Sequence, residues 1–101
     1  MNFSQGDIIK VTGLKGNFVI VSKNAFINST NVFHVCPLID KNISGPLHIF
    51  VRGKNNTEGT VICEQVKLLD LFERGCSKID RLGYGDIMNI SDAIQGVFEY
   101  D

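Results

Sequence analysis

The sequence predicts a small, mainly β domain: a barrel or half-barrel of five or six short strands, followed by a C-terminal α-helix. The chain has 101 residues, of which 44% are hydrophobic and 21% charged, so one domain's length carries enough apolar material for a core. Short segments rich in Val, Ile and Phe alternate with turn-forming residues, and the last apolar residues change to a helical spacing. We expect residues 1–101 to form a single domain.

Six segments have the length and composition of strands: 6–12, 17–22, 32–39, 47–51, 60–66 and 78–82. The connections 13–16, 24–31, 40–46 and 53–59 hold Gly, Asn, Ser and Lys, which favour turns and loops. A short helical turn over 68–73 is predicted to bridge two strands. Five or six strands at this spacing are typical of a small barrel.

The C-terminal segment has the period of an amphipathic helix. Its apolar residues recur at i, i+3, i+7, i+10 and i+11, namely Ile87, Ile90, Ile94, Val97 and Phe98. Asp86 falls in the first turn, where the helix dipole favours a carboxylate. Gly96 costs about 1 kcal/mol relative to Ala inside a helix, which predicts close packing against a neighbouring element.

Several classes of function are disfavoured. No apolar run approaches the roughly 18 residues that span a bilayer, and no secretory signal pattern opens the chain, so we expect a cytoplasmic protein without membrane contact. The chain lacks GxxxxGK[ST], HExxH and CxxC motifs, and we predict neither metal nor cofactor. The three cysteines, Cys36, Cys63 and Cys76, lie in or beside apolar segments and predict reduced thiols. His34 and Cys36 share a strand face, either as a nucleophilic pair or as packing residues.

The charge is divided between two halves. Residues 1–57 carry six basic and two acidic side chains, a net charge of +4, and residues 58–101 carry four basic and nine acidic ones, a net charge of −5. The basic half fits a phosphate backbone or an acidic partner, although a solvated surface is the simpler explanation of this feature alone. The small size of the domain also favours a dimer, because a larger core adds stability.

Nearly the whole chain resembles the MazF/PemK-type toxins. The likeness begins with QGDIIKV at 5–11, FVIVSKNAFIN at 18–28 and VFHVCPLI at 32–39, and continues with PLHIFV at 46–51, GTVICEQVKLLD at 59–70 and SKIDRL at 77–82. The segment 59–70 is the most specific, since family members commonly read G-V-V-L-C-E/D-Q-I/V-R/K-x-x-D there. The resemblance implies an SH3-like barrel with a C-terminal helix, of the kind shared with the CcdB gyrase poisons.

It also implies a toxin of a bacterial toxin-antitoxin module, a homodimer inhibited by a cognate antitoxin protein. Such toxins cut single-stranded RNA without a metal and leave a cyclic phosphate and a 5′ hydroxyl. The site then needs a base for the 2′ hydroxyl, an acid for the leaving oxygen and cations or donors around the phosphate.

Three positions depart from the family pattern. The usual Arg before the second strand falls on Gly16, the usual Thr or Ser at the end of the third falls on Ile39, and an Arg found in PemK-like members falls on Ile62. Glu64 matches the acidic position of the fifth strand. The departures favour a rival interpretation, a catalytically degenerate barrel that binds an antitoxin or inhibits a protein target as CcdB does.

Other residues are candidates for the missing roles. We predict Glu64 as the base and His48 or His34 as the acid. The predicted substrate-binding residues are Lys15, Lys23 and Arg52 for the phosphate, together with Asn17, Asp40 and Gln65. Each has a structural alternative: Glu64 bonded to backbone amides or to a Lys at a dimer contact, the histidines packed in apolar strands, and the lysines solvated. Phe26 and Phe33 either stack bases or fill the core.

Overall fold

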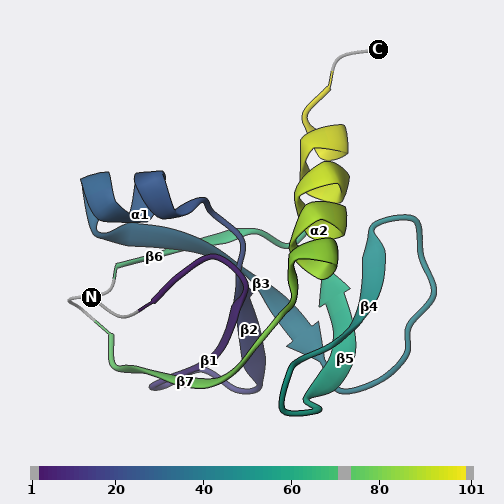
Figure 1. Ribbon diagram of the computed structural model, residues 1–101, viewed down its shortest axis with the longest axis horizontal. Helices are drawn as coiled ribbons and strands as arrows, with labels where there is room; N and C mark the ends of the chain where they lie inside the picture. Colours follow the sequence, from purple (N-terminus) through teal and green to yellow (C-terminus); the bar gives the residue numbers. More distant parts are fainter. Residues whose placement is uncertain (1–2, 71–73, 100–101) are drawn as a thin grey trace.

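The computed structural model describes residues 3–70 and 74–99. Within them, seven strands and two helices follow one another along the chain (Figure 1). The strands are β1 (Asp7–Val11), β2 (Asn17–Ile20), β3 (Val32–Ile39), β4 (His48–Arg52), β5 (Glu58–Ile62), β6 (Lys67–Asp70) and β7 (Cys76–Arg81). Helix α1 (Asn24–Thr30) precedes β3, and α2 (Tyr84–Val97) follows β7.

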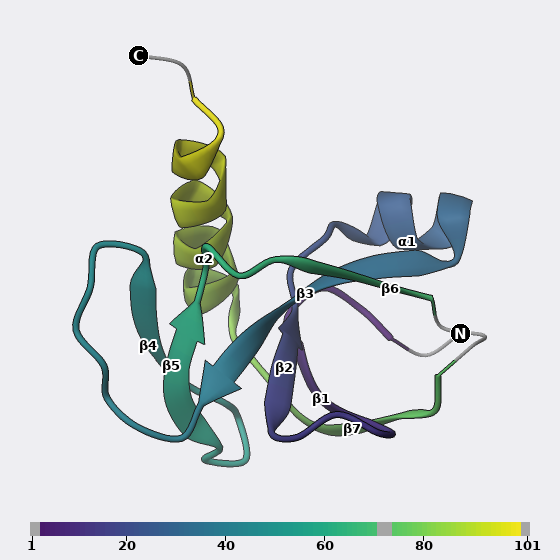
Figure 2. The ribbon, with the colours of Figure 1, turned by 180° about the vertical axis from the view of Figure 1, so that it is seen from behind.

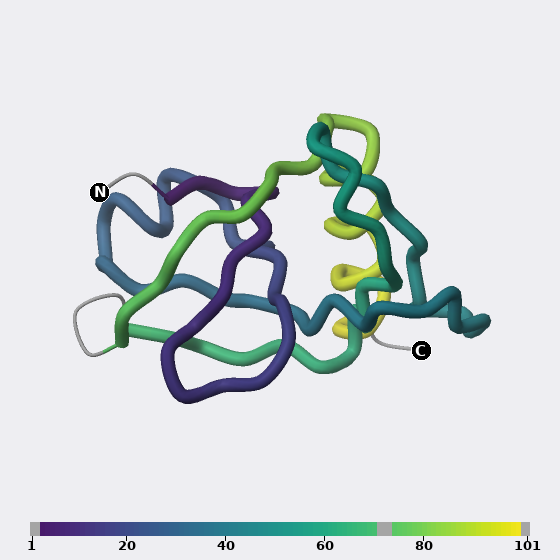
Figure 3. Tube along the Cα trace, turned by 90° about the horizontal axis from the view of Figure 1, so that it is seen from below, coloured from purple at the N-terminus to yellow at the C-terminus, as the bar shows by residue number. Residues whose placement is uncertain are grey.

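The strands form one antiparallel sheet in the order β4-β5-β3-β2-β1-β7, with β6 paired to β3 beside this path. Strand β3 joins two halves of the molecule: its first residues, Val32–Val35, pair with β6, and Leu38 and Ile39 pair with β5. Figure 3 shows β3 running from the α1 side to the α2 side of the molecule. The mainly β fold with a C-terminal helix is therefore confirmed, as a strongly curved sheet whose described pairings leave β4 and β7 at its ends.

The central strands are buried on both faces, which explains their continuous apolar runs. In β1, Ile8 belongs to a core cluster beneath α2, whereas the adjacent Ile9 belongs to a second cluster with Phe33 and Leu69. Adjacent residues of a strand point to opposite faces, so one short strand contributes to both clusters. Phe33 is fully buried, and the centroids of its ring and the Phe3 ring are 6.2 Å apart. Of the two roles predicted for Phe33, base stacking and core packing, the structure therefore shows core packing.

Helix α2 packs only its first three turns on the sheet. Ile90 is 2% exposed and Asp86 lies in the first turn, as predicted. Val97 and Phe98, predicted on the packed face, are 40% and 76% exposed, because the end of α2 projects beyond the sheet (Figures 1 and 2). Within the described residues, neither helix has the length and apolar character needed to cross a membrane.

The predicted secondary structure is wrong in three segments. The predicted connection 24–31 contains helix α1 (Asn24–Thr30), which is anchored by buried Ile27 and ended by its C-cap Asn31 in the left-handed conformation, φ 59°. The predicted helical turn over 68–73 is strand β6 as far as Asp70, because β3 offers a free edge there, and residues 71–73 lie outside the described part. The strand predicted over 60–66 ends at Ile62, and the turn that follows it carries Glu64.

The close packing predicted around Gly96 is also wrong, since a Cβ at this position would meet nothing within 4 Å. We therefore expect Gly96→Ala to raise the free energy of unfolding in urea by up to about 1 kcal/mol. Gly13→Ala is the control: it has the same open space but a φ of +85°, which strains an L side chain, so it should lower stability. A destabilising Gly96→Ala would contradict the open surroundings of this residue.

Candidate functional site

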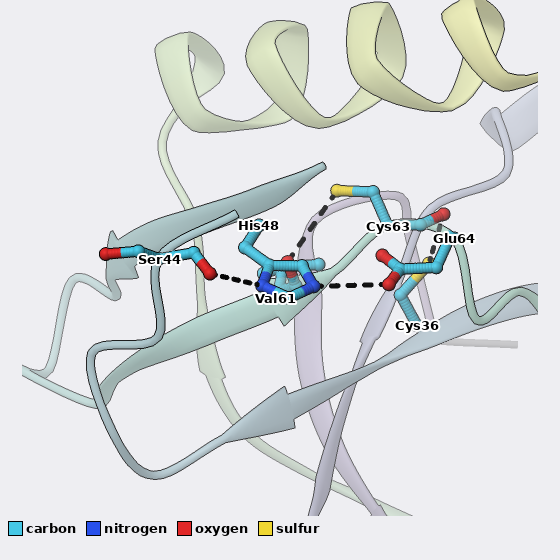
Figure 4. Close-up of polar contacts among 6 residues, drawn as sticks. All are labelled: Cys36, Ser44, His48, Val61, Cys63 and Glu64. Carbon is cyan, nitrogen blue, oxygen red and sulfur yellow. Dashed lines mark hydrogen bonds and ion pairs between the residues drawn. The ribbon is translucent and has the colours of Figure 1, made fainter. Parts of the chain in front are cut away.

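The clearest polar constellation joins the start of β4 to the turn after β5. His48 lies opposite Ile62 in the β4–β5 register, and Glu64 is two residues beyond Ile62 along the chain. His48 Nε2 and Glu64 Oε2 are 3.2 Å apart, with 20% and 42% of the two side chains exposed (Figure 4). A substrate thus has access to a paired imidazole and carboxylate.

The second imidazole nitrogen has its own acceptor. His48 Nδ1 lies 3.2 Å from the backbone oxygen of Ser44, and Gly45 packs against the ring so closely that a Cβ there would stand 2.5 Å from Nδ1. A neutral imidazole donates from only one nitrogen, whereas an imidazolium donates from both. The ring of His48 thus has a backbone carbonyl beside Nδ1 and a carboxylate beside Nε2, so both of its nitrogens face an acceptor.

The carboxylate of the pair is held in its ionised form. The pKa of Glu64 is lowered, first by a hydrogen bond from its own backbone amide and then by the hydrogen bond from His48. The bond to a backbone amide, predicted as the structural alternative for Glu64, is thus present, whereas its role as the base stays a prediction. An ionised carboxylate beside a proton donor is the arrangement that general acid-base chemistry requires.

The buried thiols behind the pair are inert. Burial raises the pKa of Cys36 to about 12, with the charges of Cys63 and Glu64 adding to the effect, and burial followed by the charge of Glu64 raises that of Cys63 to about 11. Cys36 Sγ donates weakly to the backbone oxygen of Cys63, 3.9 Å away, and Cys63 Sγ to that of Val61, 3.8 Å away (Figure 4). The hypothesis of a nucleophilic cysteine is therefore wrong, since the thiolate is the nucleophile.

The pair lies on what we call the outer face, the side of β4 and β5 turned away from α2. Val51, Val61 and Cys63 pack in the cluster that contains Ile90 of α2. Because side chains alternate along a strand, the intervening residues point to the other side. These residues are His48, Phe50 and Arg52 on β4, and Glu58, Thr60, Ile62 and then Glu64 on and after β5. Position 62, where PemK-like members have an Arg, thus faces the same side as the pair.

A second polar region is a cleft of about 510 Å³ beside this face, lined by Lys10, Gly16, Asn17, Leu38, Ile39, Asp40, Thr57 and Glu58. Two of the three departures from the family pattern, Gly16 and Ile39, therefore lie in one cleft. Lys10 is its cation, and Asp40 and Glu58 are its carboxylates. The side-chain oxygen of Asn17 is buried there and accepts no hydrogen bond from any residue that the structure describes.

The other predicted site residues lie at the rim of this cleft, in a separate cleft against α2, or in exposed turns. Arg52 Nη2 donates to Glu58 Oε2 at 2.9 Å, so this cation reaches the rim of the cleft. His34 and Lys23 line a separate, largely apolar cleft of about 390 Å³ against α2, where the His34 ring lies 5.2 Å from that of Phe26. Lys15 is exposed in the β1–β2 turn, and Gln65 is exposed next to Glu64.

Of the two histidines, the structure brings only His48 to Glu64. Sequence reasoning did not single out Ser44, Lys10 or Phe50. Ser44 acts through its backbone oxygen, which leaves no signal in the sequence, whereas alternation with His48 and Arg52 along one strand does mark Phe50. Across residues 3–70 and 74–99, no three His, Cys, Asp or Glu side chains are grouped so that they could hold a metal ion.

A family model described as the PemK-like, MazF-like toxin of type II toxin-antitoxin systems matches residues 5–98. The chain belongs to this family. None of the curated proteins compared with this MazF-like chain matches it.

Solved structures of similar fold agree with this assignment. A MazE-MazF complex from Deinococcus radiodurans has a TM-score of 0.82 at 14% identity, over 98% of this chain and 97% of that one. An endoribonuclease bound to its cognate antitoxin, from a mycobacterial species, has a TM-score of 0.79 at 17% identity, over 98% and 99% of the two chains. A mycobacterial endoribonuclease has a TM-score of 0.79 at 18% identity, over 95% and 90%. At these identities the likeness establishes the fold of the MazF-like chain.

Proposed function

We propose that this MazF-like toxin is a metal-independent endoribonuclease that cleaves single-stranded RNA. The observation that carries the proposal is the His48–Glu64 pair, an ionised carboxylate 3.2 Å from an imidazole on an accessible face. An ionised carboxylate beside a second titratable group can provide the base and the acid of one reaction.

The two groups divide the proton transfers of a transesterification. Glu64 takes the proton of the 2′ hydroxyl, and the resulting oxygen attacks the adjacent phosphorus to form the O2′–P bond. As the P–O5′ bond breaks, His48 gives its Nε2 proton to the departing 5′ oxygen. The products are a 2′,3′-cyclic phosphate and a 5′ hydroxyl, so the step consumes no water. The carbonyl of Ser44 holds the imidazolium in place through Nδ1.

The groups that would balance the negative charge of the scissile phosphate differ from those of the family pattern. Positions 16, 39 and 62 supply no cation or hydroxyl, whereas Arg52 on the outer face and Lys10 in the cleft do carry positive charge, and we propose that His48 acts in its protonated form. The loss of one phosphate donor commonly lowers a rate by about 10²-fold, so we propose that turnover is slow.

The partners follow from the same proposal. The similar structures include a MazE-MazF complex and an endoribonuclease with its cognate antitoxin. We propose that this chain likewise forms a homodimer, binds an antitoxin protein and acts in the cytoplasm, where its RNA substrate is found.

One observation favours a second candidate function, a barrel that binds without catalysis. The cleft that contains Gly16 and Ile39 has two carboxylates, Asp40 and Glu58, beside the single cation Lys10. Carboxylates repel a phosphate, so this cleft suits a cationic or neutral protein segment better than an RNA backbone.

An end-labelled cleavage assay tests the proposal. Purified protein is incubated in EDTA with a long single-stranded RNA, and the product ends are analysed. We expect discrete fragments that carry 2′,3′-cyclic phosphates and 5′ hydroxyls. Intact RNA after incubation with folded protein would contradict the nuclease and favour the binding barrel.

A further inference from the structure

Phe50 is an aromatic ring that the core does not use. It lies in the middle of β4, and 44% of its surface is exposed, whereas its neighbour Val51 is 1% exposed and packs beneath α2. Alternation places Phe50 on the outer face, between His48 and Arg52. The exposed ring therefore belongs to the surface that carries the His48–Glu64 pair.

The spacing on this face brings the ring close to charged groups on both sides. Residues two apart on a strand are roughly 7 Å apart, so Phe50 has an imidazole on one side and a guanidinium on the other at that distance. Directly opposite Phe50 on β5 is Thr60, whose hydroxyl donates to the backbone oxygen of Lys41 and accepts from the backbone amide of Ile43. The hydroxyl of Thr60 is thus used within the protein, whereas His48 and Arg52 flank the ring along β4.

The same face is continuous with the cleft. Arg52 uses Nη2 to bond Glu58, a residue that lines the cleft, and its other guanidinium donors stay available on a side chain that is 63% exposed. A strand of nucleic acid that follows β4 would therefore meet a guanidinium, an aromatic ring and the catalytic pair in that order.

We infer that Phe50 is a stacking platform for a base of single-stranded RNA next to the scissile phosphate. This inference rests on the proposed function and makes Phe50 a positioning residue, because it holds the base while His48 and Glu64 move protons. Stacking on an aromatic face accepts every base, so the platform adds affinity without selecting a sequence.

A second copy of this chain suits the ring less well. Contact over Phe50 would also bury His48 with Glu64 and Arg52 with Glu58, and desolvation of two ion pairs opposes such an interface. A nucleotide instead covers the ring with its base and leaves its phosphate beside the cations.

Binding of a short fluorescein-labelled single-stranded RNA tests the inference, by anisotropy in a Glu64→Gln background that removes the proposed base. Phe50→Ala should weaken the affinity about tenfold, within the range measured for loss of one base-aromatic stack. Phe50→Tyr keeps the aromatic face and should bind normally, whereas Phe50→Leu keeps apolar volume without that face and should bind like the Ala variant. The matched control is Phe98→Ala, which removes a ring that is 76% exposed in the other cleft and should change nothing.

Three results would overturn the inference: unchanged binding in Phe50→Ala, normal binding in Phe50→Leu, or absence of RNA binding from the unsubstituted background. A change in oligomeric mass in Phe50→Ala, measured by light scattering, would also overturn it by assigning the ring to a contact between protein copies. RNA that is bound but not cleaved by the wild type would refute the nuclease proposal alone, since the stacking measurement needs no cleavage.

Discussion

Glu64→Gln is expected to lower the rate of RNA cleavage by about 10²- to 10⁴-fold, the range that one general acid-base group contributes. The amide keeps the shape of the side chain and can still accept from His48 Nε2, 3.2 Å away in the wild type, but it cannot take up the 2′ proton. The measurement is the single-turnover rate on a saturating RNA. Glu99→Gln, the same change at an exposed residue beyond α2, is the control and should cleave normally.

The cleavage rate should also depend on pH in a way that identifies Glu64 as the base. Because the pKa of Glu64 is lowered, its base form persists below the pH at which an ordinary carboxylate becomes protonated. The wild-type rate should therefore fall only at a pH below the usual carboxyl range, and the residual rate of Glu64→Gln should lack this acid limb. An acid limb above that range would be inconsistent with Glu64 as the base.

His48→Gln provides a companion to this variant. If the two residues act as one unit, the double variant should lose little more than the more damaging single change. Additive losses would mean that the pair seen in the structure does not operate together. A loss of rate in Glu64→Gln accompanied by a lower Tm would instead indicate a structural role for the carboxylate.

The sequence predicts the His48–Glu64 pair only in part, for a physical reason. Alternation places His48 and His34 equally well within apolar strands, and nothing local distinguishes them. The difference is one of pairing: β4 lies beside β5, so His48 reaches the turn that carries Glu64, whereas His34 lies opposite Leu68 on β6. Tertiary packing decides which strands lie side by side, and no short segment of the sequence carries that information.

The errors in secondary structure have the same origin. Residues 24–31 are rich in Asn, Ser and Thr, which favour turns in isolation, yet they form α1 because Ile27 is buried in the cluster around Phe33. Leu69 became part of a strand because β3 offered its backbone groups beside it. By contrast, the C-terminal helix was predictable, since its period of apolar residues is long and its core contact, Ile90, falls in the middle. Long periodic segments thus carry their own signal, whereas short ones take their structure from their neighbours.

Asp80→Asn is expected to lower the free energy of unfolding by about 2 to 4 kcal/mol, since hydrogen bonds to a buried charge are among the costlier ones to lose. Asp80 is 3% exposed and accepts hydrogen bonds from the backbone amides of Asn55 at 2.9 Å, Thr57 at 3.0 Å and Arg81 at 2.7 Å. It thereby ties β7 to the β4–β5 turn, and Gly53 leaves it space, because a Cβ there would stand 2.2 Å from the carboxylate. A domain of this size should lose roughly 10 to 20 °C in Tm.

The loss of stability in Asp80→Asn should depend on pH, because the Asp80 carboxyl group titrates. Burial disfavours the charged form of Asp80, but the hydrogen bonds from Asn55, Arg81 and Thr57 outweigh it and lower the pKa to about 2, from 3.8 for an ordinary Asp. A carboxyl group with a depressed pKa stabilises the fold fully above its unfolded pKa, and this contribution disappears as the pH falls through its folded pKa. The difference in urea stability between wild type and Asp80→Asn should therefore be constant near neutral pH and shrink between about pH 4 and pH 2.

Asp92→Asn removes an exposed carboxylate of α2 and is the control: it should change neither the stability nor its dependence on pH. The turn that Asp80 holds also carries Thr57, which lines the cleft that contains Gly16 and Ile39. If the difference in stability between wild type and Asp80→Asn stayed constant from about pH 4 to about pH 2, the charge of Asp80 would not be what holds this wall of the cleft in place.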